Sequence, residues 1–152
     1  MFFWFIGIGV LIFKYVFKDN KADLRYLITG LLVLDFLDIL LSIEPIGKEL
    51  KFITHSLIFS VFTMFLIMLF SKRGSKVRKN SLLFSIGLYL HLFLDFMWLD
   101  QAIFLYPLPS ETIDIFKKTL LMVVAQELIG VTYLIYKLKN QSIREFIKNG
   151  II

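Results

Sequence analysis

Five long apolar runs constrain the fold of this sequence more than any other feature. Each run is long enough to cross, or nearly to cross, a hydrocarbon core of ~30 Å at ~1.5 Å per helical residue. The runs cover residues 2–17, 26–43, 52–70, 81–106 and 118–137. They predict an all-α, polytopic protein of the cell membrane, a multi-pass bundle of about five transmembrane helices that forms a single domain over residues 1–152.

The composition favours a membrane protein over a soluble one. Hydrophobic residues make up 58% of the chain, with 17 phenylalanines, and a soluble fold of 152 residues could not bury so much apolar side chain and keep a polar exterior. A cleaved signal peptide is the alternative for residues 2–17, but that run lacks a basic n-region and a small-residue cleavage site. The sequence contains no cysteine, which excludes disulfides and thiolate metal sites.

The basic residues predict the orientation in the membrane. All but four of the 17 basic residues fall on one side if every run crosses. The exceptions are Lys48, Lys51, Lys117 and Lys118. Because basic residues are enriched in cytoplasmic segments, we expect the N-terminus outside and the C-terminus in the cytoplasm. The anionic neighbours of these bases are then phospholipid head groups, and no nucleic-acid partner is expected.

The residues after the fifth run, 138–152, form a tail with an amphipathic pattern. Ile143 and Phe146 recur at helical spacing with Ile147, opposite Arg144 and Lys148. This pattern favours a helix on the cytoplasmic membrane surface. A disordered tail is the alternative that the sequence leaves open.

Ionisable residues interrupt the apolar runs, where each costs on the order of 2.5–3.5 kcal/mol to insert. Such residues normally face the interior of a helix bundle and serve a function. Counted from the expected entry points, they lie at a similar depth in the outer half of the bilayer, on four helices. They are Asp35, Asp38, His55, His91, Asp95, Asp100 and Glu127. Their shared depth predicts a polar site inside the bundle.

The spacing of these residues suits a metal site. Asp35 and Asp38 are three residues apart, and His91 and Asp95 are four apart, so each pair can share one face of a helix. Mixed carboxylate and imidazole ligands suit a divalent metal ion such as Zn²⁺, Mn²⁺ or Fe²⁺, and several carboxylates also allow Mg²⁺. We therefore expect these four residues and His55 to be metal ligands.

Other interpretations of single residues stay open. Either histidine alone is more often a hydrogen-bonded interior residue than a ligand. Asp38 can be a ligand, a group that orients a histidine, or the catalytic general base. Asp100 can orient a metal ligand without touching the metal, or it can lie among the outer head groups. Glu127 can also support the ligands, or it can pair with a lysine or with the backbone of a neighbouring helix.

Three short motifs carry a resemblance to a known family. They are Leu34–Asp38 (Leu-Asp-Phe-Leu-Asp), Ile53–Leu57 (Ile-Thr-His-Ser-Leu) and His91–Asp95 (His-Leu-Phe-Leu-Asp), followed by Phe104–Pro107. In order and spacing they resemble the YdjM-like family of membrane-bound metal-dependent hydrolases, whose signatures are Pro-Asp-x-Asp, His-Arg-Gly-x-Thr-His-Ser and His-Leu-x-x-Asp. The resemblance covers approximately residues 26–108. It implies a small helical membrane domain with hydrolase chemistry on a phosphoester.

The chain also departs from that family pattern. Leu34 stands for the proline of the first motif, and the aspartates of this motif are three residues apart where the family has two. Leu50 and Phe52 stand where the second motif has its first histidine and its glycine. If that histidine is a ligand in the family, Glu49 or Asp100 would have to compensate here.

Together these features predict a membrane hydrolase that uses a metal-activated water. A site in the outer half of the bundle favours a membrane lipid or a lipid-linked substrate that enters sideways from the phospholipid bilayer. One alternative is a proton or divalent-cation transporter or channel that uses the same residues as a relay. A second is an inactive family member that acts as a scaffold. The sequence leaves the oligomeric state open.

Overall fold

The computed structural model describes residues 1–41, 52–108, 118–138 and 143–151, and the regular elements in these ranges are helices without a strand. The long helices are α1 (Phe2–Phe17), α2 (Leu24–Leu41), α4 (Leu57–Phe70), α5 (Lys76–Leu94) and α7 (Leu120–Leu138). The short ones are η1 (Met97–Leu99), α6 (Gln101–Phe104) and α8 (Ile143–Asn149). The prediction of an all-α chain is confirmed. Five residues named in the sequence argument lie outside the described residues: Lys48, Glu49, Leu50, Lys51 and Lys117.

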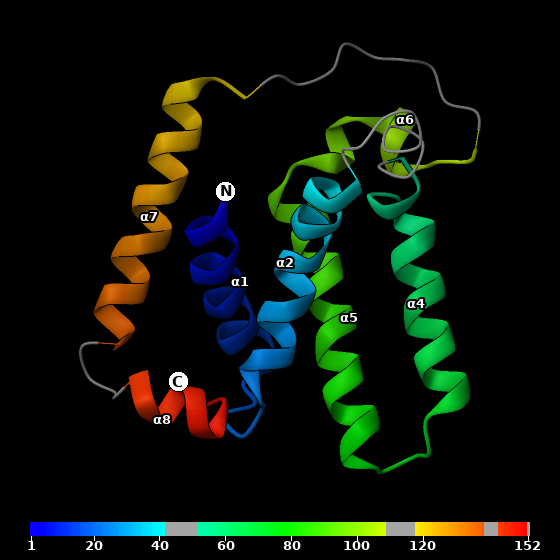
Figure 1. The fold of residues 1–152 in the computed structure, drawn as a ribbon, viewed down its shortest axis with the longest axis vertical. Helices are drawn as coiled ribbons and strands as arrows, with labels where there is room; N and C mark the ends of the chain where they lie inside the picture. Colours follow the sequence, from blue (N-terminus) through cyan, green and yellow to red (C-terminus); the bar gives the residue numbers. More distant parts are fainter. Residues whose placement is uncertain (42–51, 109–117, 139–142, 152) are drawn as a thin grey trace.

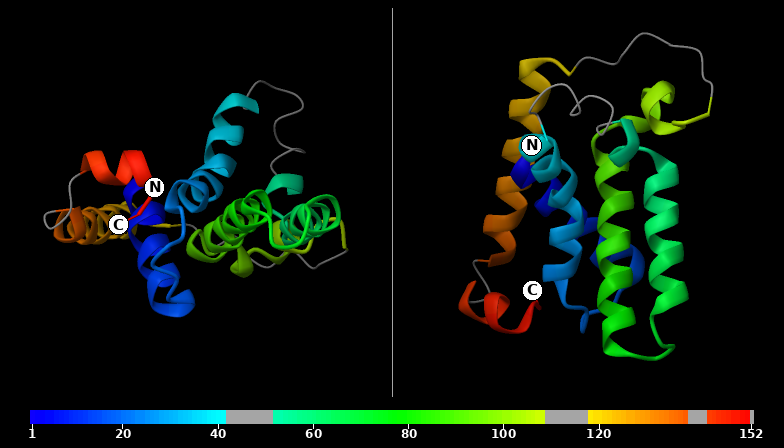
Figure 2. Two further views of the ribbon diagram at one scale, coloured as in Figure 1. Left: turned by 90° about the horizontal axis from the view of Figure 1, so that it is seen from below. Right: turned by 45° about the vertical axis from the view of Figure 1, so that its right-hand side comes forward.

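The long helices lie side by side and alternate in direction along the chain (Figure 1). The most extensive contact is between α2 and α5, which run in the same direction, while α7 packs on α1 and α4 packs on α5. The two further views show α4 beside α5 again (Figure 2). The α2–α5 pair therefore forms the centre of the bundle.

Two glycines bring the backbones of α2 and α5 together. A Cβ atom added at Gly30 would collide with the carbonyl oxygen of Phe84, and one added at Gly87 would collide with that of Leu27. Small residues at such crossings are typical of helix pairs in membranes, because they let two backbones approach closely. This crossing fixes the position of α5 along α2.

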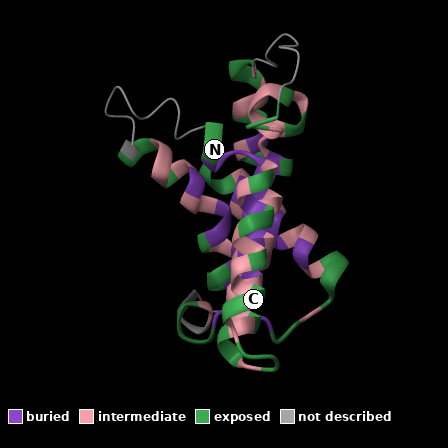
Figure 3. Ribbon diagram, turned by 90° about the vertical axis from the view of Figure 1, so that its right-hand side faces the viewer, coloured by how far each residue is buried: buried purple, intermediate pink, exposed green. Residues whose placement is uncertain are grey.

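The buried side chains form two apolar clusters around this central pair. The larger joins α1, α2 and α5 and includes Phe5, Val10 and Leu27, while the smaller consists of Leu34, Leu88 and Leu92. The outer faces of the helices also carry many exposed apolar side chains, and Figure 3 shows exposed and half-buried positions spread along their length. Such an exterior is unsuited to water and is typical of a surface in contact with lipid.

The helix ends differ from the predicted spans mainly in two places. The fourth apolar run, 81–106, is not one helix, because α5 ends at Leu94 and Phe96 takes a left-handed backbone conformation with φ 61°. Asp100 then begins α6, since its carboxylate accepts a hydrogen bond from the Ile103 N–H at 3.4 Å. In the third run, α4 begins at Leu57, after Ser56. Hydrophobicity predicts burial or contact with lipid, but it does not predict where the backbone leaves the helical conformation.

By length and composition, α7 is the one described helix able to cross a membrane by itself. The helices α1 and α4 are apolar but shorter than 18 residues. The helices α2 and α5 are long enough, but charged residues lower their apolar character. These charges are Arg25, Asp35 and Asp38 in α2 and Lys76, Arg78 and Lys79 in the first turn of α5.

The end of the chain returns to the start of α2. The guanidinium of Arg25 donates a hydrogen bond to the carbonyl oxygen of Ile147 at 2.9 Å, and the Leu24 N–H donates to that of Gly150 at 2.7 Å. Asp23 pairs with the same guanidinium at 2.6 Å. Arg25 thus lowers the pKa of the Asp23 carboxyl. Phe146 of α8 packs against the larger apolar cluster.

Candidate metal centre

Three polar residues from three segments meet near one end of the bundle. Asp35 lies on α2, His55 directly precedes α4, and His91 lies on α5. Each offers one ligand atom, and the three atoms lie within 4.8 Å of one another. Both imidazole side chains are buried, with exposed fractions of 1% and 0%, whereas 38% of the Asp35 side chain is exposed. The structure therefore brings together three of the five predicted ligands.

His91 is held with one ring nitrogen turned toward this group. Its Nδ1 lies 2.7 Å from the carbonyl oxygen of Leu31, which can only accept a hydrogen bond, so Nδ1 carries the proton. In the neutral ring Nε2 then has a free lone pair. This nitrogen lies 3.8 Å from Oδ1 of Asp35, and it is buried without a hydrogen-bond partner among the described residues. Phe5 packs on the ring, with the ring centroids 4.4 Å apart.

This arrangement of His91 is typical of a metal ligand. Histidines that bind metals usually donate their other ring N–H to a carbonyl or a carboxylate, which fixes the tautomer and the ring orientation. A buried nitrogen without a partner is costly, and a cation would satisfy it. The α2–α5 crossing places the carbonyl of Leu31 where it can orient the ring.

His55 is positioned by the start of α4. It precedes Ser56, whose hydroxyl caps the helix by accepting a hydrogen bond from the Phe59 N–H at 3.1 Å. The sequence placed His55 about one turn inside a helix, but the structure places it just before one. Its Nδ1 lies 3.2 Å from the hydroxyl of Thr54 and 3.6 Å from Oδ1 of Asp38. Its ring meets that of His91 edge to face, with centroids 5.5 Å apart.

The two aspartates of α2 divide between the two histidines. Asp35 lies beside His91, and Asp38, one turn further on, lies beside His55. Asp38 is not in the three-residue group, and its contact suits the orientation of the His55 ring better than direct ligation. Two carboxylates next to two buried imidazoles form an electron-rich site, and a bound cation would compensate its negative charge.

The chain also matches a known family of membrane proteins. The family model described as YdjM inner membrane protein matches residues 4–149. The chain belongs to this family. The match covers nearly the whole chain, so the resemblance seen in the motifs is confirmed, and the chain is a membrane protein. No curated protein and no solved structure matches it.

In this YdjM family member, the other three predicted site residues make contacts outside the three-residue group. Asp95 forms an ion pair with Lys118, whose ammonium also lies 5.6 Å from the centre of the Phe96 ring. Asp100 caps α6, as described above. Glu127 accepts a hydrogen bond from the backbone N–H of Phe3 at 2.9 Å, and so pairs with a neighbouring helix. Neither Asp95 nor Glu127 is part of the three-residue group.

The donor set fits a divalent metal ion. Two imidazoles and one carboxylate suit Zn²⁺ in a catalytic site and Fe²⁺ in sites with two histidines and one carboxylate. Mg²⁺ prefers oxygen ligands and fits this set less well. Two atoms that each lie ~2.0–2.2 Å from one ion are at most ~4.4 Å apart. The 3.8 Å between His91 Nε2 and Asp35 Oδ1 meets this limit, and the whole three-atom group lies within 4.8 Å.

Proposed function

We propose that this protein is an integral membrane hydrolase that depends on a divalent metal, either Zn²⁺, Mn²⁺, Fe²⁺ or Mg²⁺. Its reaction is the cleavage of a phosphoester in a lipid or a lipid-linked substrate. The observation that carries this proposal is the buried Nε2 atom of His91, which is oriented by the carbonyl of Leu31 and directed at Asp35. An interior histidine of purely structural use would be expected to satisfy both ring nitrogens.

The residues of the site have different roles. A divalent metal supplies a water of lowered pKa and polarises the phosphoryl oxygen when it is bound. Asp35, His55 and His91 would hold it, and the carbonyl of Leu31 would keep His91 in the tautomer that can ligate. Asp38 lies 3.6 Å from His55 Nδ1, where its carboxylate can orient that ring or accept a proton from the attacking water. Asp95, paired with Lys118, would support the end of α5 that carries His91.

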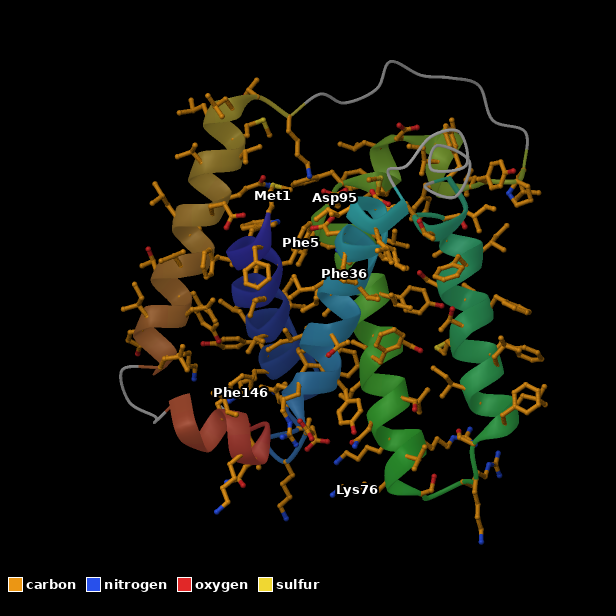
Figure 4. All side chains as sticks on the ribbon, in the orientation of Figure 1. Met1, Phe5, Phe36, Lys76, Asp95 and Phe146 are labelled. Atoms are coloured by element: carbon orange, nitrogen blue, oxygen red, sulfur yellow. The ribbon has the colours of Figure 1, made fainter. Side chains whose placement is uncertain are left out.

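We further propose that all five long helices cross the membrane, with the N-terminus outside. Their alternating directions agree with successive crossings (Figure 1). In Figure 4, Lys76 and Phe146 lie at the opposite end of the bundle from Met1 and Asp95, so the basic first turn of α5 and the tail helix α8 share one end. Asp19, in the segment between α1 and α2, pairs with Lys79 at 2.9 Å at that end. The charges of α2 and α5 then belong either to the site or to the cytoplasmic interface.

Metal analysis of protein purified in detergent without chelators tests the site. We expect close to one Zn²⁺, Mn²⁺ or Fe²⁺ per chain and a sharp loss in His91→Ala. Asp19→Asn is the control, because it removes a carboxylate far from the site. A wild-type protein that is metal-free and takes up neither Zn²⁺ nor Mn²⁺ would contradict the proposal. Flux of protons or metal in sealed vesicles, without cleavage of any phosphoester, would instead support a transporter.

A further inference from the structure

An apolar groove of about 460 Å³ lies beside the candidate metal centre. It is lined by Phe2 of α1 and by one face of α2, which includes Ile28, Thr29, Phe36 and Ile39. Asp35 is the single charged residue in its lining. Since Asp35 is also one of the three clustered ligand residues, the groove and the candidate centre share a wall.

The groove is long enough for a large part of one lipid chain. From Asp35 its lining on α2 reaches Ile28 in one direction, about 10 Å along a helix at ~1.5 Å per residue, and Ile39 in the other, about 6 Å. The two parts together are about half of a ~30 Å hydrocarbon core. The volume also falls within the ~300–1,000 Å³ that is usual for small-molecule sites.

The lining chemistry selects an apolar occupant with one polar end. Water would find few partners, because the hydroxyl of Thr29 already donates a hydrogen bond to the Arg25 carbonyl at 2.8 Å. An empty groove would forfeit dispersion contacts along its walls. In a membrane, a hydrocarbon chain supplies these contacts. Asp35 breaks the apolar lining next to the two histidines, so the polar end of the occupant belongs there.

We propose that the groove holds one acyl chain of a phospholipid whose head group lies at Asp35. This inference rests on the proposed function and names its substrate class, a long-chain phospholipid that enters sideways from the bilayer. The chain lies along α2, and the phosphoester is brought next to Asp35, His55 and His91. Phe36, of which 63% is exposed, lines the groove one residue beyond Asp35 and contacts the chain near its head group.

Photolabelling tests the groove without requiring turnover. The protein is placed in vesicles of phosphatidylethanolamine and phosphatidylglycerol that contain a phospholipid with a diazirine on its acyl chain. We expect peptides from α2 to be labelled several-fold more than the apolar face of α4, where Phe62 and Phe65 are exposed to bulk lipid. Thr29→Phe should lower the labelling of α2 several-fold, because the added ring fills the groove.

Thr132→Phe provides a matched control on α7. Thr132 is also an exposed helical threonine, and its hydroxyl donates to the Leu128 carbonyl at 2.7 Å, but it does not line the groove. Equal labelling of α2 and α4, or no effect of Thr29→Phe, would overturn the inference. Displacement of the label by an isoprenyl phosphate but not by unlabelled phospholipid would overturn it as well.

Hydrolysis assays separate this inference from the proposed function. If the wild type cleaves a soluble phosphodiester with metal, and Thr29→Phe changes neither that cleavage nor the cleavage of long-chain phospholipid, the hydrolase stands and the groove is refuted. If α2 is labelled as expected but no phosphoester is cleaved, the groove binds a chain and the proposed function fails. The inference expects Thr29→Phe to lose phospholipid cleavage several-fold and to keep cleavage of the soluble ester.

Discussion

Replacing Gly87 with alanine would test whether the α2–α5 contact controls metal affinity, because the substitution changes no ligand residue. A Cβ at this position collides with the carbonyl of Leu27 and lies 2.9 Å from the Cα of Gly30, so α2 and α5 must move apart. Overpacking of this kind costs about 1–3 kcal/mol of stability. The same movement stretches the 2.7 Å contact between His91 Nδ1 and the Leu31 carbonyl. Loss of a group that orients a metal ligand weakens metal binding by about 10–100-fold, which corresponds to about 1.4–2.8 kcal/mol.

Zinc titration and thermal unfolding in the same detergent measure the two effects. Gly130→Ala is the matched control, because its Cβ would collide with the backbone of Phe3 at the α1–α7 contact, which includes neither histidine. We expect both variants to lose stability and only Gly87→Ala to lose zinc affinity. Wild-type zinc affinity in a folded Gly87→Ala protein would refute the reasoning, and an equal loss in both variants would refute it too.

Three further predictions concern the carboxylates and the topology. Asp35→Asn should lose the metal, whereas Asp38→Asn should keep most of it and lose turnover. Equal metal content in the two variants by elemental analysis would contradict this division. Because the pKa of Asp23 is lowered in the folded state, its stabilisation is present above the unfolded pKa of ~3.9 and is lost as pH falls. Asp23→Asn should therefore cost about 1 kcal/mol or less at pH 7 and progressively less as pH falls below ~3.9 in thermal unfolding, and a difference independent of pH would count against the pair. Reporters inserted near Ser75 should behave as cytoplasmic and those near Gly47 as external, and finding both on one side would disprove five crossings.

The sequence was sufficient to predict an all-α membrane protein and three of the residues that the structure brings together. Apolar runs predicted α1 at its observed ends, and the ionisable residues inside such runs predicted Asp35, His55 and His91. This succeeded because a charged or imidazole group in an apolar segment must face a polar partner, whatever the details of the packing. The prediction therefore rested on the free-energy cost of an ionisable group in an apolar segment, which can be recognised from the local sequence.

Asp95 shows where local spacing stops being informative. Its four-residue distance from His91 predicted a shared ligand role. In the structure Asp95 caps α5 and its backbone N–H still donates to the carbonyl of His91, but its carboxylate pairs with Lys118, which is 23 residues further along the chain. A partner at that distance leaves no periodic signal. His55 was misplaced for a simpler reason, since Ser56 is a residue type that favours the cap of a helix rather than its interior.

His91 is oriented by the main-chain oxygen of Leu31, but the place of that oxygen depends on other residues. A Leu31→Met substitution would change the side chain and leave the accepting carbonyl in place. The acceptor is instead sensitive to Gly30 and Gly87, which carry no functional group but set how closely the two backbones approach. A mutational scan of this protein would therefore register Leu31 only through its buried side chain and would assign the role of its carbonyl to two glycines.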